Sequence, residues 1–309
     1  MKRIAVVGAG AIGGFVAAAL VRSGVEVGVV ARGEHGAAIA RDGLHVASDL
    51  GSFSSRVTVV EDARALGELD AALLTFKAHQ WRELLPQLAP LGGTRTTIVT
   101  MQNGVPFWYA RRPPLRSVDP HGTIGRTFPD TQVVGAVVHV SGEIVAPGRI
   151  RQSGGLRYVF GDPAGGAGAQ TAAMVALFKG AGLAPQEDPA IRQTLWLKLV
   201  NNVGLNAMSV FERKTIKELL ADPTARARVR RLMNETLEVG RAMRIVSDVD
   251  VDARIEYAAR LSDVKTSMLQ DFERGRALEV DPILGAVCEL GERYGVATPE
   301  VRRAYDALR

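Results

Sequence analysis

The chain has 309 residues, of which 47% are apolar and 23% charged, a composition typical of a globular protein with room for two domains. Its 38 basic and 33 acidic residues leave a net charge of +5 that is spread along the chain, whereas nucleic-acid-binding proteins cluster their basic residues. We therefore expect no nucleic-acid partner. Cys288 is the single cysteine and lies among apolar residues, which indicates a packing role and a reducing, cytoplasmic environment.

An uncharged stretch at 4–21 superficially resembles a membrane span or a signal peptide. Gly8, Gly10, Gly13 and Gly14 argue against both, because they fall where a tight turn between a strand and a helix needs glycine. We expect no membrane partner.

Short β-rich runs alternate with helical patterns as far as residue 188, which predicts an α/β domain with a parallel sheet. The predicted strands are 4–7, 26–30, 57–60, 71–75, 96–100, 133–140 and 157–160, with helices at 12–22, 80–88 and 170–180. Beyond this point helical periodicity prevails, at 191–210, 223–243, 250–261, 266–275, 282–294 and 299–308. The sequence thus predicts an α/β domain over 1–188 and an all-helical domain over 189–309.

A glycine-rich turn, GAGAIG, joins the first strand to the first helix and matches the dinucleotide-binding fingerprint of a Rossmann domain. Glycine permits the tight turn, brings backbone amides close to a pyrophosphate and lets the helix pack on the strand, while the helix N-terminus favours phosphate. A glycine turn without a ligand is the alternative. The residues expected to hold the cofactor are Gly8, Ala9, Gly10, Ala11, Ile12 and Gly13.

Arg32 follows the second strand, where an enzyme that uses NAD would carry an acidic residue for the ribose 2′-hydroxyl. A guanidinium group there would pair with a 2′-phosphate and favour NADP(H). Lys77, just after the strand at 71–75, could add a second positive charge near the cofactor. For both residues a solvated surface charge is the alternative, and the nearby Glu34 weakens the argument for Arg32.

The segment from Leu195 to Asn206 reads as a buried helix that is apolar almost all round, yet it carries Lys198, Asn202 and Asn206 at four-residue spacing. This spacing predicts that the three side chains share one face. A lysine in such a helix must lose its charge, gain an acidic partner or reach an aqueous cleft, and each outcome suits a proton donor. A lysine that extends to solvent at a domain edge is the alternative.

Polar residues gather again further along, around Ser267 and between Glu279 and Pro282. Asp281 before Pro282 predicts a helix N-cap, and Glu279 just outside this helix could point into an interdomain cleft. Ser267 is equally well explained as a hydroxyl at a helix start.

With these residues in place, the sequence resembles the ketopantoate reductase (2-dehydropantoate 2-reductase) family over nearly its whole length. The resemblance implies an N-terminal Rossmann domain and an all-helical C-terminal domain like that of 6-phosphogluconate dehydrogenase, with NADPH and a 2-keto acid meeting between them. Its markers are GAGAIGG at 8–14, Arg32, Lys77-Ala-His-Gln80, Gln102-Asn103-Gly104, Trp196-x-Lys198-x-x-x-Asn202-x-x-x-Asn206, Ser267-Met-Leu-Gln-Asp271 and Glu279-x-Asp281.

The resemblance also implies roles for single residues. Lys198 corresponds to the general acid and Glu279 to a substrate-binding glutamate, and Asn103 would lie near the nicotinamide. Arg32 and Lys77 match residues credited with contacts to the cofactor phosphates, whereas Asn202, Asn206 and Ser267 match residues that line the substrate site.

The chain departs from the family's simplest members after Gly104, in a long loop with Phe107, Trp108 and Tyr109. The loop could reshape the pocket for the substrate's acyl group, or its aromatic cluster could form an exposed surface for a homodimer.

The sequence therefore predicts NADPH-dependent reduction of ketopantoate to pantoate, without a metal. A reductase of another 2-keto acid and a non-catalytic NADPH-binding sensor are the alternatives, although a sensor has no need of a buried lysine.

Overall fold

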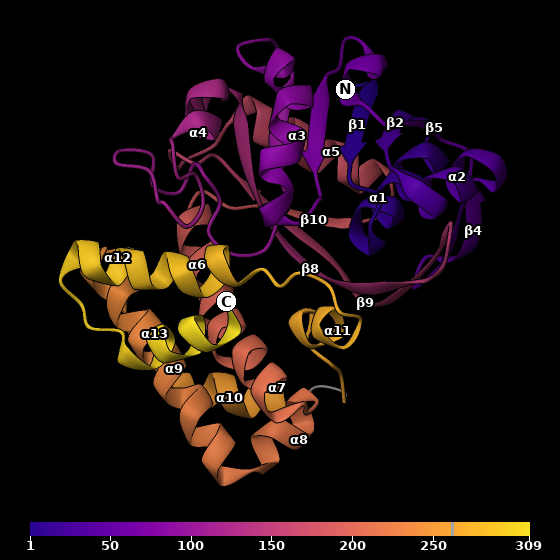
Figure 1. Ribbon diagram of the computed structural model, residues 1–309. Helices are drawn as coiled ribbons and strands as arrows, with labels where there is room; N and C mark the ends of the chain where they lie inside the picture. Colours follow the sequence, from indigo (N-terminus) through magenta and orange to yellow (C-terminus); the bar gives the residue numbers. More distant parts are fainter. Residues whose placement is uncertain (261–262) are drawn as a thin grey trace. The chain divides into compact units, whose positions relative to one another are not determined.

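The computed structural model describes residues 1–260 and 263–309, which divide into two compact units. The first comprises Met1–Gln102 and Thr123–Ile191, and the second comprises Asn103–Gly122 and Arg192–Arg309. The chain thus passes between the units after residues 102, 122 and 191, and the aromatic loop belongs to the second unit. Figure 1 labels helices and strands of both units. A functional division at residue 188 stays a prediction.

A ten-stranded sheet forms the centre of the first unit, in the order β4-β3-β9-β8-β7-β6-β1-β2-β5, with β10 beside β9. The strands are β1 (Arg3–Val7), β2 (Glu26–Val30), β3 (Leu44–Ser48), β4 (Gly51–Ser55), β5 (Thr58–Val60), β6 (Ala71–Leu74), β7 (Thr97–Thr100), β8 (Val133–Ala146), β9 (Arg149–Gly161) and β10 (Ala184–Glu187). The helices are α1 (Ala11–Arg22), α2 (Gly33–Asp42), α3 (Trp81–Leu88), α4 (Thr123–Thr127) and α5 (Ala169–Gly180). Short 3₁₀ turns lie at η1 (Ala63–Leu66), η2 (Ala78–Gln80), η3 (Ala89–Leu91) and η4 (Asp130–Gln132).

The parallel part of the sheet confirms the predicted α/β fold. Strand β1 pairs in parallel with β2 on one side and with β6 on the other. The chain therefore reverses its direction of travel across the sheet at β1, and open α/β sheets bind their ligands at the carboxyl end of strands at such a point. The glycine turn follows β1 at that end.

The sequence did not predict the hairpin of β3 and β4, strand β10 or helix α2. Strand β4 is serine-rich and mostly exposed, so it lacks the alternating apolar pattern that identifies a strand. Strands β8 and β9 are also longer than expected and form a twisted antiparallel pair with register shifts at 139–146.

Helices make up most of the second unit. They are α6 (Ile191–Asn201), α7 (Ala207–Glu212), α8 (Ile216–Ala221), α9 (Pro223–Ala242), α10 (Val251–Arg260), α11 (Ser267–Glu273), α12 (Ala286–Tyr294) and α13 (Pro299–Leu308), with π-helical turns η5 (Asn202–Asn206) and η6 (Asp281–Gly285). The predicted helix over 250–261 extends into residues outside the described ranges.

The regular helix expected over 191–210 is interrupted by the π turn η5, so that expectation is wrong, and the common face of Lys198, Asn202 and Asn206 stays a prediction. In this turn Gly204 packs against α9, where a Cβ atom would lie 2.8 Å from the Met233 side chain. Turns of this kind occur frequently at functional sites.

Two smaller expectations can be compared with the structure. Asp281 lies inside the π turn and accepts a hydrogen bond from the Tyr305 hydroxyl at 2.6 Å, so its prediction as an N-cap is wrong. Cys288 is buried, as a packing role requires, and burial raises the pKa of its thiol. Among the described residues, no helix is both long and apolar enough to cross a membrane.

We predict that Gly13→Ala destabilises the fold, whereas Gly10→Ala changes it little. A Cβ atom on Gly13 would lie 2.1 Å from the Gly8 carbonyl oxygen and 2.4 Å from Thr75 Oγ1, while one on Gly10 meets nothing within 4 Å. Denaturant unfolding should show a loss of about 1–3 kcal/mol for Gly13→Ala and less than about 1 kcal/mol for Gly10→Ala. Equal stability of the two variants would contradict the close packing of α1 on β1.

Candidate active site

The glycine turn after β1 is held rigidly by its neighbours. Gly8 has φ +100°, and a Cβ atom there would lie 2.8 Å from the Phe76 backbone nitrogen, so only glycine fits. Thr75 Oγ1 donates to the carbonyl oxygens of Val7 at 3.1 Å and of Gly8 at 2.7 Å. Gly10 adjoins open space at the start of α1. A fixed turn with free space at a helix N-terminus fits a cofactor pyrophosphate.

His35 also fixes this turn, a role for which the sequence carries no local signal. Its Nδ1 accepts a hydrogen bond from the Gly148 backbone N–H at 3.1 Å, so the ring proton lies on Nε2 and is donated to the Ala9 carbonyl oxygen at 2.8 Å. The imidazole thereby joins the turn to the segment between β8 and β9.

Arg32 occupies the N-cap position of α2, directly beyond β2, and its guanidinium group pairs with the Glu83 carboxylate. The hydrogen bond that Arg32 donates to Glu83, together with the negative charge of Glu83, raises the pKa of Arg32, and the same contact lowers the pKa of Glu83. Lys77 precedes η2, where its backbone N–H donates to Gln80 Oε1 at 3.0 Å. Arg32 and Lys77 thus lie beyond the carboxyl ends of β2 and β6, and their contacts with a cofactor stay predictions.

The second unit contains a chain of polar groups centred on Asn103. Lys198 Nζ donates to Asn103 Oδ1 at 3.0 Å, and Asn103 Nδ2 donates to Glu279 Oε2 at 3.4 Å. Glu279 is buried, with 5% of its surface exposed. Asn103, expected near the nicotinamide, therefore bridges the lysine and the glutamate, although 95 residues separate it from Lys198.

The apolar surroundings of the Lys198 ammonium group lower its pKa to about 8, against the opposing charge of Glu279. The sequence left open whether burial or the charge of Glu279 has the larger effect on this pKa. In the structure the effect of burial is larger. A lysine with this pKa carries its proton at neutral pH and releases it more readily than an exposed lysine, as a general acid must.

Backbone packing fixes Asn103 in this position. Gly104 has φ +79°, and a Cβ atom there would lie 2.5 Å from the Pro282 carbonyl oxygen. The Val105 backbone N–H donates to that same oxygen at 2.7 Å. Residues 103–105 therefore lie directly against η6, the turn that follows Glu279, so Asn103 and Glu279 are brought together by main-chain contacts.

The aromatic loop is buried, and its proposed role as an exposed apolar surface is wrong. Phe107, Trp108 and Tyr109 are each at most 3% exposed. The Tyr109 ring stacks on Trp196 with centroids 5.9 Å apart, and its hydroxyl donates to the Arg192 carbonyl oxygen at 3.0 Å. The loop therefore packs on α6 beside Lys198.

The remaining predicted substrate residues are placed by neighbouring elements. Asn202 and Asn206 lie at the two ends of η5, and Asn206 is buried. Ser267 is the exposed first residue of α11, and the helix-start hydroxyl is that of Thr266, which accepts from the Leu269 backbone N–H at 3.1 Å. Since η5 contacts both α11 and η6, these residues belong to one region of the second unit.

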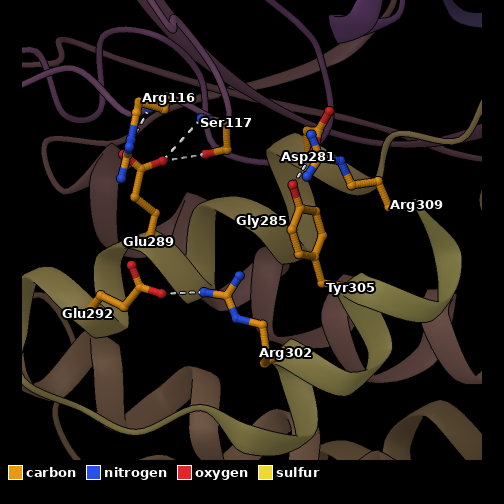
Figure 2. A pocket seen from close by; sticks show the side chains of 9 residues that line it. All are labelled: Arg116, Ser117, Asp281, Gly285, Glu289, Glu292, Arg302, Tyr305 and Arg309. Carbon is orange, nitrogen blue, oxygen red and sulfur yellow. Dashed lines mark hydrogen bonds and ion pairs between the residues drawn. The ribbon is translucent and has the colours of Figure 1, made fainter.

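A cavity of about 460 Å³ opens on the same unit between the loop, α12 and α13 (Figure 2). Its acidic side chains are engaged with neighbours. Glu289 accepts hydrogen bonds from the backbone N–H groups of Arg116 at 2.8 Å and Ser117 at 3.1 Å. Glu292 forms an ion pair with Arg302, and Asp281 accepts a hydrogen bond from the Tyr305 hydroxyl. The cavity thus marks where the loop is fastened to α12.

A glycine turn at the switch point of a parallel sheet, followed by a helical unit with a half-buried lysine, defines the class of nucleotide-dependent oxidoreductases with a Rossmann-like domain. Residues 4–165 match the family described as ketopantoate reductase PanE/ApbA, and residues 190–309 match its C-terminal region. The chain belongs to the ketopantoate reductase family, whose reaction is the reduction of 2-dehydropantoate.

Relatives match over almost the entire chain. A 2-dehydropantoate 2-reductase of Mesorhizobium japonicum is 38% identical over 97% of this chain and 94% of its own length. The structure of a proposed ketopantoate reductase from Ralstonia solanacearum MolK2 is 36% identical, with a TM-score of 0.93 over 100% of this chain and 97% of its own. A 2-dehydropantoate 2-reductase of Geobacter metallireducens is 27% identical, with a TM-score of 0.88 over 99% of this chain and 98% of its own.

We expect Glu289→Ala to loosen the loop. The substitution leaves two backbone N–H groups and the Ser117 hydroxyl without their carboxylate acceptor, at a cost of about 1–3 kcal/mol. Glu292→Ala is the matched control, because Glu292 lies on the same helix but pairs with Arg302 of α13. Trypsin should cleave after Arg111 or Arg116 faster in Glu289→Ala alone, and equal rates in both variants would refute this fastening role.

Proposed function

We propose that this chain reduces 2-dehydropantoate (ketopantoate) to pantoate with NADPH, and that Lys198 is the general acid. The observation that carries the proposal is the chain from Lys198 through Asn103 to Glu279, in which a half-buried lysine keeps a transferable proton. Full-length similarity to 2-dehydropantoate 2-reductases supports the choice of substrate.

The residues assigned to the cofactor fit a dinucleotide. The open space beside Gly10 at the start of α1 suits the pyrophosphate, and the Arg32 guanidinium suits the 2′-phosphate of NADPH. The assigned cofactor residues are Gly8, Ala9, Gly10, Ala11, Ile12, Gly13, Arg32, Lys77 and Asn103, and the assigned substrate residues are Asn202, Asn206, Ser267 and Glu279.

When bound, NADPH supplies the hydride that reduces C2 of the keto acid. The protein must then provide a proton for the keto oxygen, and Lys198 Nζ holds one at neutral pH. Asn103 accepts a hydrogen bond from Lys198, which orients the ammonium group. Glu279 stabilises the ammonium by its negative charge, and its buried carboxylate is suited to accept a hydrogen bond from a substrate hydroxyl.

A panel of 2-keto acids tests the reaction and the substrate together. We expect the 340 nm absorbance of NADPH to fall fastest with ketopantoate. Turnover with a different 2-keto acid alone would instead assign another substrate to the same chemistry. Saturable NADPH binding without turnover of any member would identify a sensor.

Lys198→Ala should lower kcat at least about a hundredfold while the fold and the affinity for NADPH are retained, because loss of a general acid removes the proton source. In the unmodified protein kcat/KM should fall as the pH rises through about 8, since the pKa of Lys198 is lowered to that value and the ammonium form prevails only below it.

The exposed Lys217 of α8 provides the control, and Lys217→Ala should match the unmodified protein. Steady-state kinetics of the three proteins measure kcat, NADPH titration measures cofactor affinity, and circular dichroism checks that each variant is folded. A folded Lys198→Ala protein with near-normal kcat would remove Lys198 from the mechanism.

A further inference from the structure

Glu83 lies where the specificity for the cofactor is expected to be decided. We propose that Glu83 is a specificity-determining residue whose carboxylate competes with the 2′-phosphate of NADPH for the Arg32 guanidinium, and thereby reduces the discrimination between NADPH and NADH. This inference rests on the proposed role of Arg32 in cofactor binding. It adds an acidic residue that the sequence pattern around β2 does not reveal, because Glu83 follows Arg32 by 51 residues.

The position of the pair supports this role. Arg32 follows the end of β2, the strand beside β1, and in Rossmann domains the residue at this point contacts the ribose 2′ position. Its guanidinium group donates to Glu83 Oε1. The group on the 2′ position of the cofactor's ribose, a hydroxyl or a phosphate, must therefore be accommodated beside an arginine that already has an acidic partner.

Helix α3 presents Glu83 from a fixed backbone. Trp81 begins the helix and is buried, its ring meets Phe76 edge-on with centroids 5.0 Å apart, and its indole N–H donates to Gln102 Oε1 at 3.2 Å. The Glu83 side chain itself is 55% exposed. The carboxylate can consequently rotate away from Arg32, while the backbone keeps it within reach.

The local charges favour competition. Glu83 and the exposed Glu61 both stabilise the charge of Arg32, so two negative groups act on one guanidinium. A phosphate monoester carries about −1.5 to −2 charges at neutral pH and is repelled by both carboxylates. The ribose 2′-hydroxyl of NADH is neutral and can donate to a carboxylate, as it does to the acidic residue of NAD enzymes. Glu83 thus opposes NADPH and accommodates NADH.

The test compares the affinities of NADPH and NADH for the full chain by fluorescence titration in four proteins: unmodified, Glu83→Gln, Arg32→Ala and Glu26→Gln. Glu26 pairs with Arg3 at 3.2 Å and is 69% exposed at the opposite end of β2, so Glu26→Gln removes the same charge and a similar ion pair far from the turn. Thermal unfolding should be alike in Glu83→Gln and Glu26→Gln, because exposed ion pairs contribute little to stability.

We expect Glu83→Gln to raise the preference for NADPH over NADH about threefold or more, chiefly through tighter NADPH binding, and Glu26→Gln to leave it unchanged. Arg32→Ala should abolish most of the preference. If Arg32→Ala does so while Glu83→Gln matches Glu26→Gln, the competition by Glu83 is refuted and the role of Arg32 stands. If Arg32→Ala keeps the preference, the proposed role of Arg32 fails and the inference fails with it.

Discussion

The ammonium group of Lys198 lies in apolar surroundings, and such a group is stable only if polar partners replace the water that it has lost. Asn103 is its hydrogen-bond partner, and Glu279 supplies the opposite charge. With less support, burial would lower the pKa of Lys198 further and the proton would be lost at neutral pH. The arrangement of the second unit follows from this requirement, because the three side chains come from three separate segments that must be held together.

The loop at 103–122 meets that requirement. At its start, Gly104 and Val105 pack on the Pro282 carbonyl, which sets Asn103 beside Glu279. A few residues later, Tyr109 stacks on Trp196, two positions before Lys198 in α6. One short segment therefore contacts both the helix of the lysine and the turn after the glutamate. This explains why an insertion between β7 and α4 of the sheet unit packs with the helices.

In the first unit the governing constraint is the close approach of α1 to the sheet. Gly13 leaves room for the Gly8 carbonyl and Thr75, and Thr75 and His35 hold the carbonyl oxygens of the turn. The turn is thus held by contacts within the protein itself, so binding of a cofactor should require little ordering of the backbone. The charged pair of Arg32 and Glu83 stands in contrast, since both side chains are exposed and can change partner.

The sequence by itself determined the α/β character of the N-terminal part, the glycine turn and the helical character of the C-terminal part, because apolar periodicity and glycine spacing are local properties. It also singled out Lys198 and Glu279. Only the tertiary structure decided that a π turn interrupts the helix after Lys198, that the aromatic loop is buried and that burial prevails over Glu279 in setting the pKa of Lys198. Partners such as Asn103 with Glu279, 176 residues apart, and Arg32 with Glu83 likewise have no local signature. Packing brings such residues together, and no repeat or spacing along the chain encodes it.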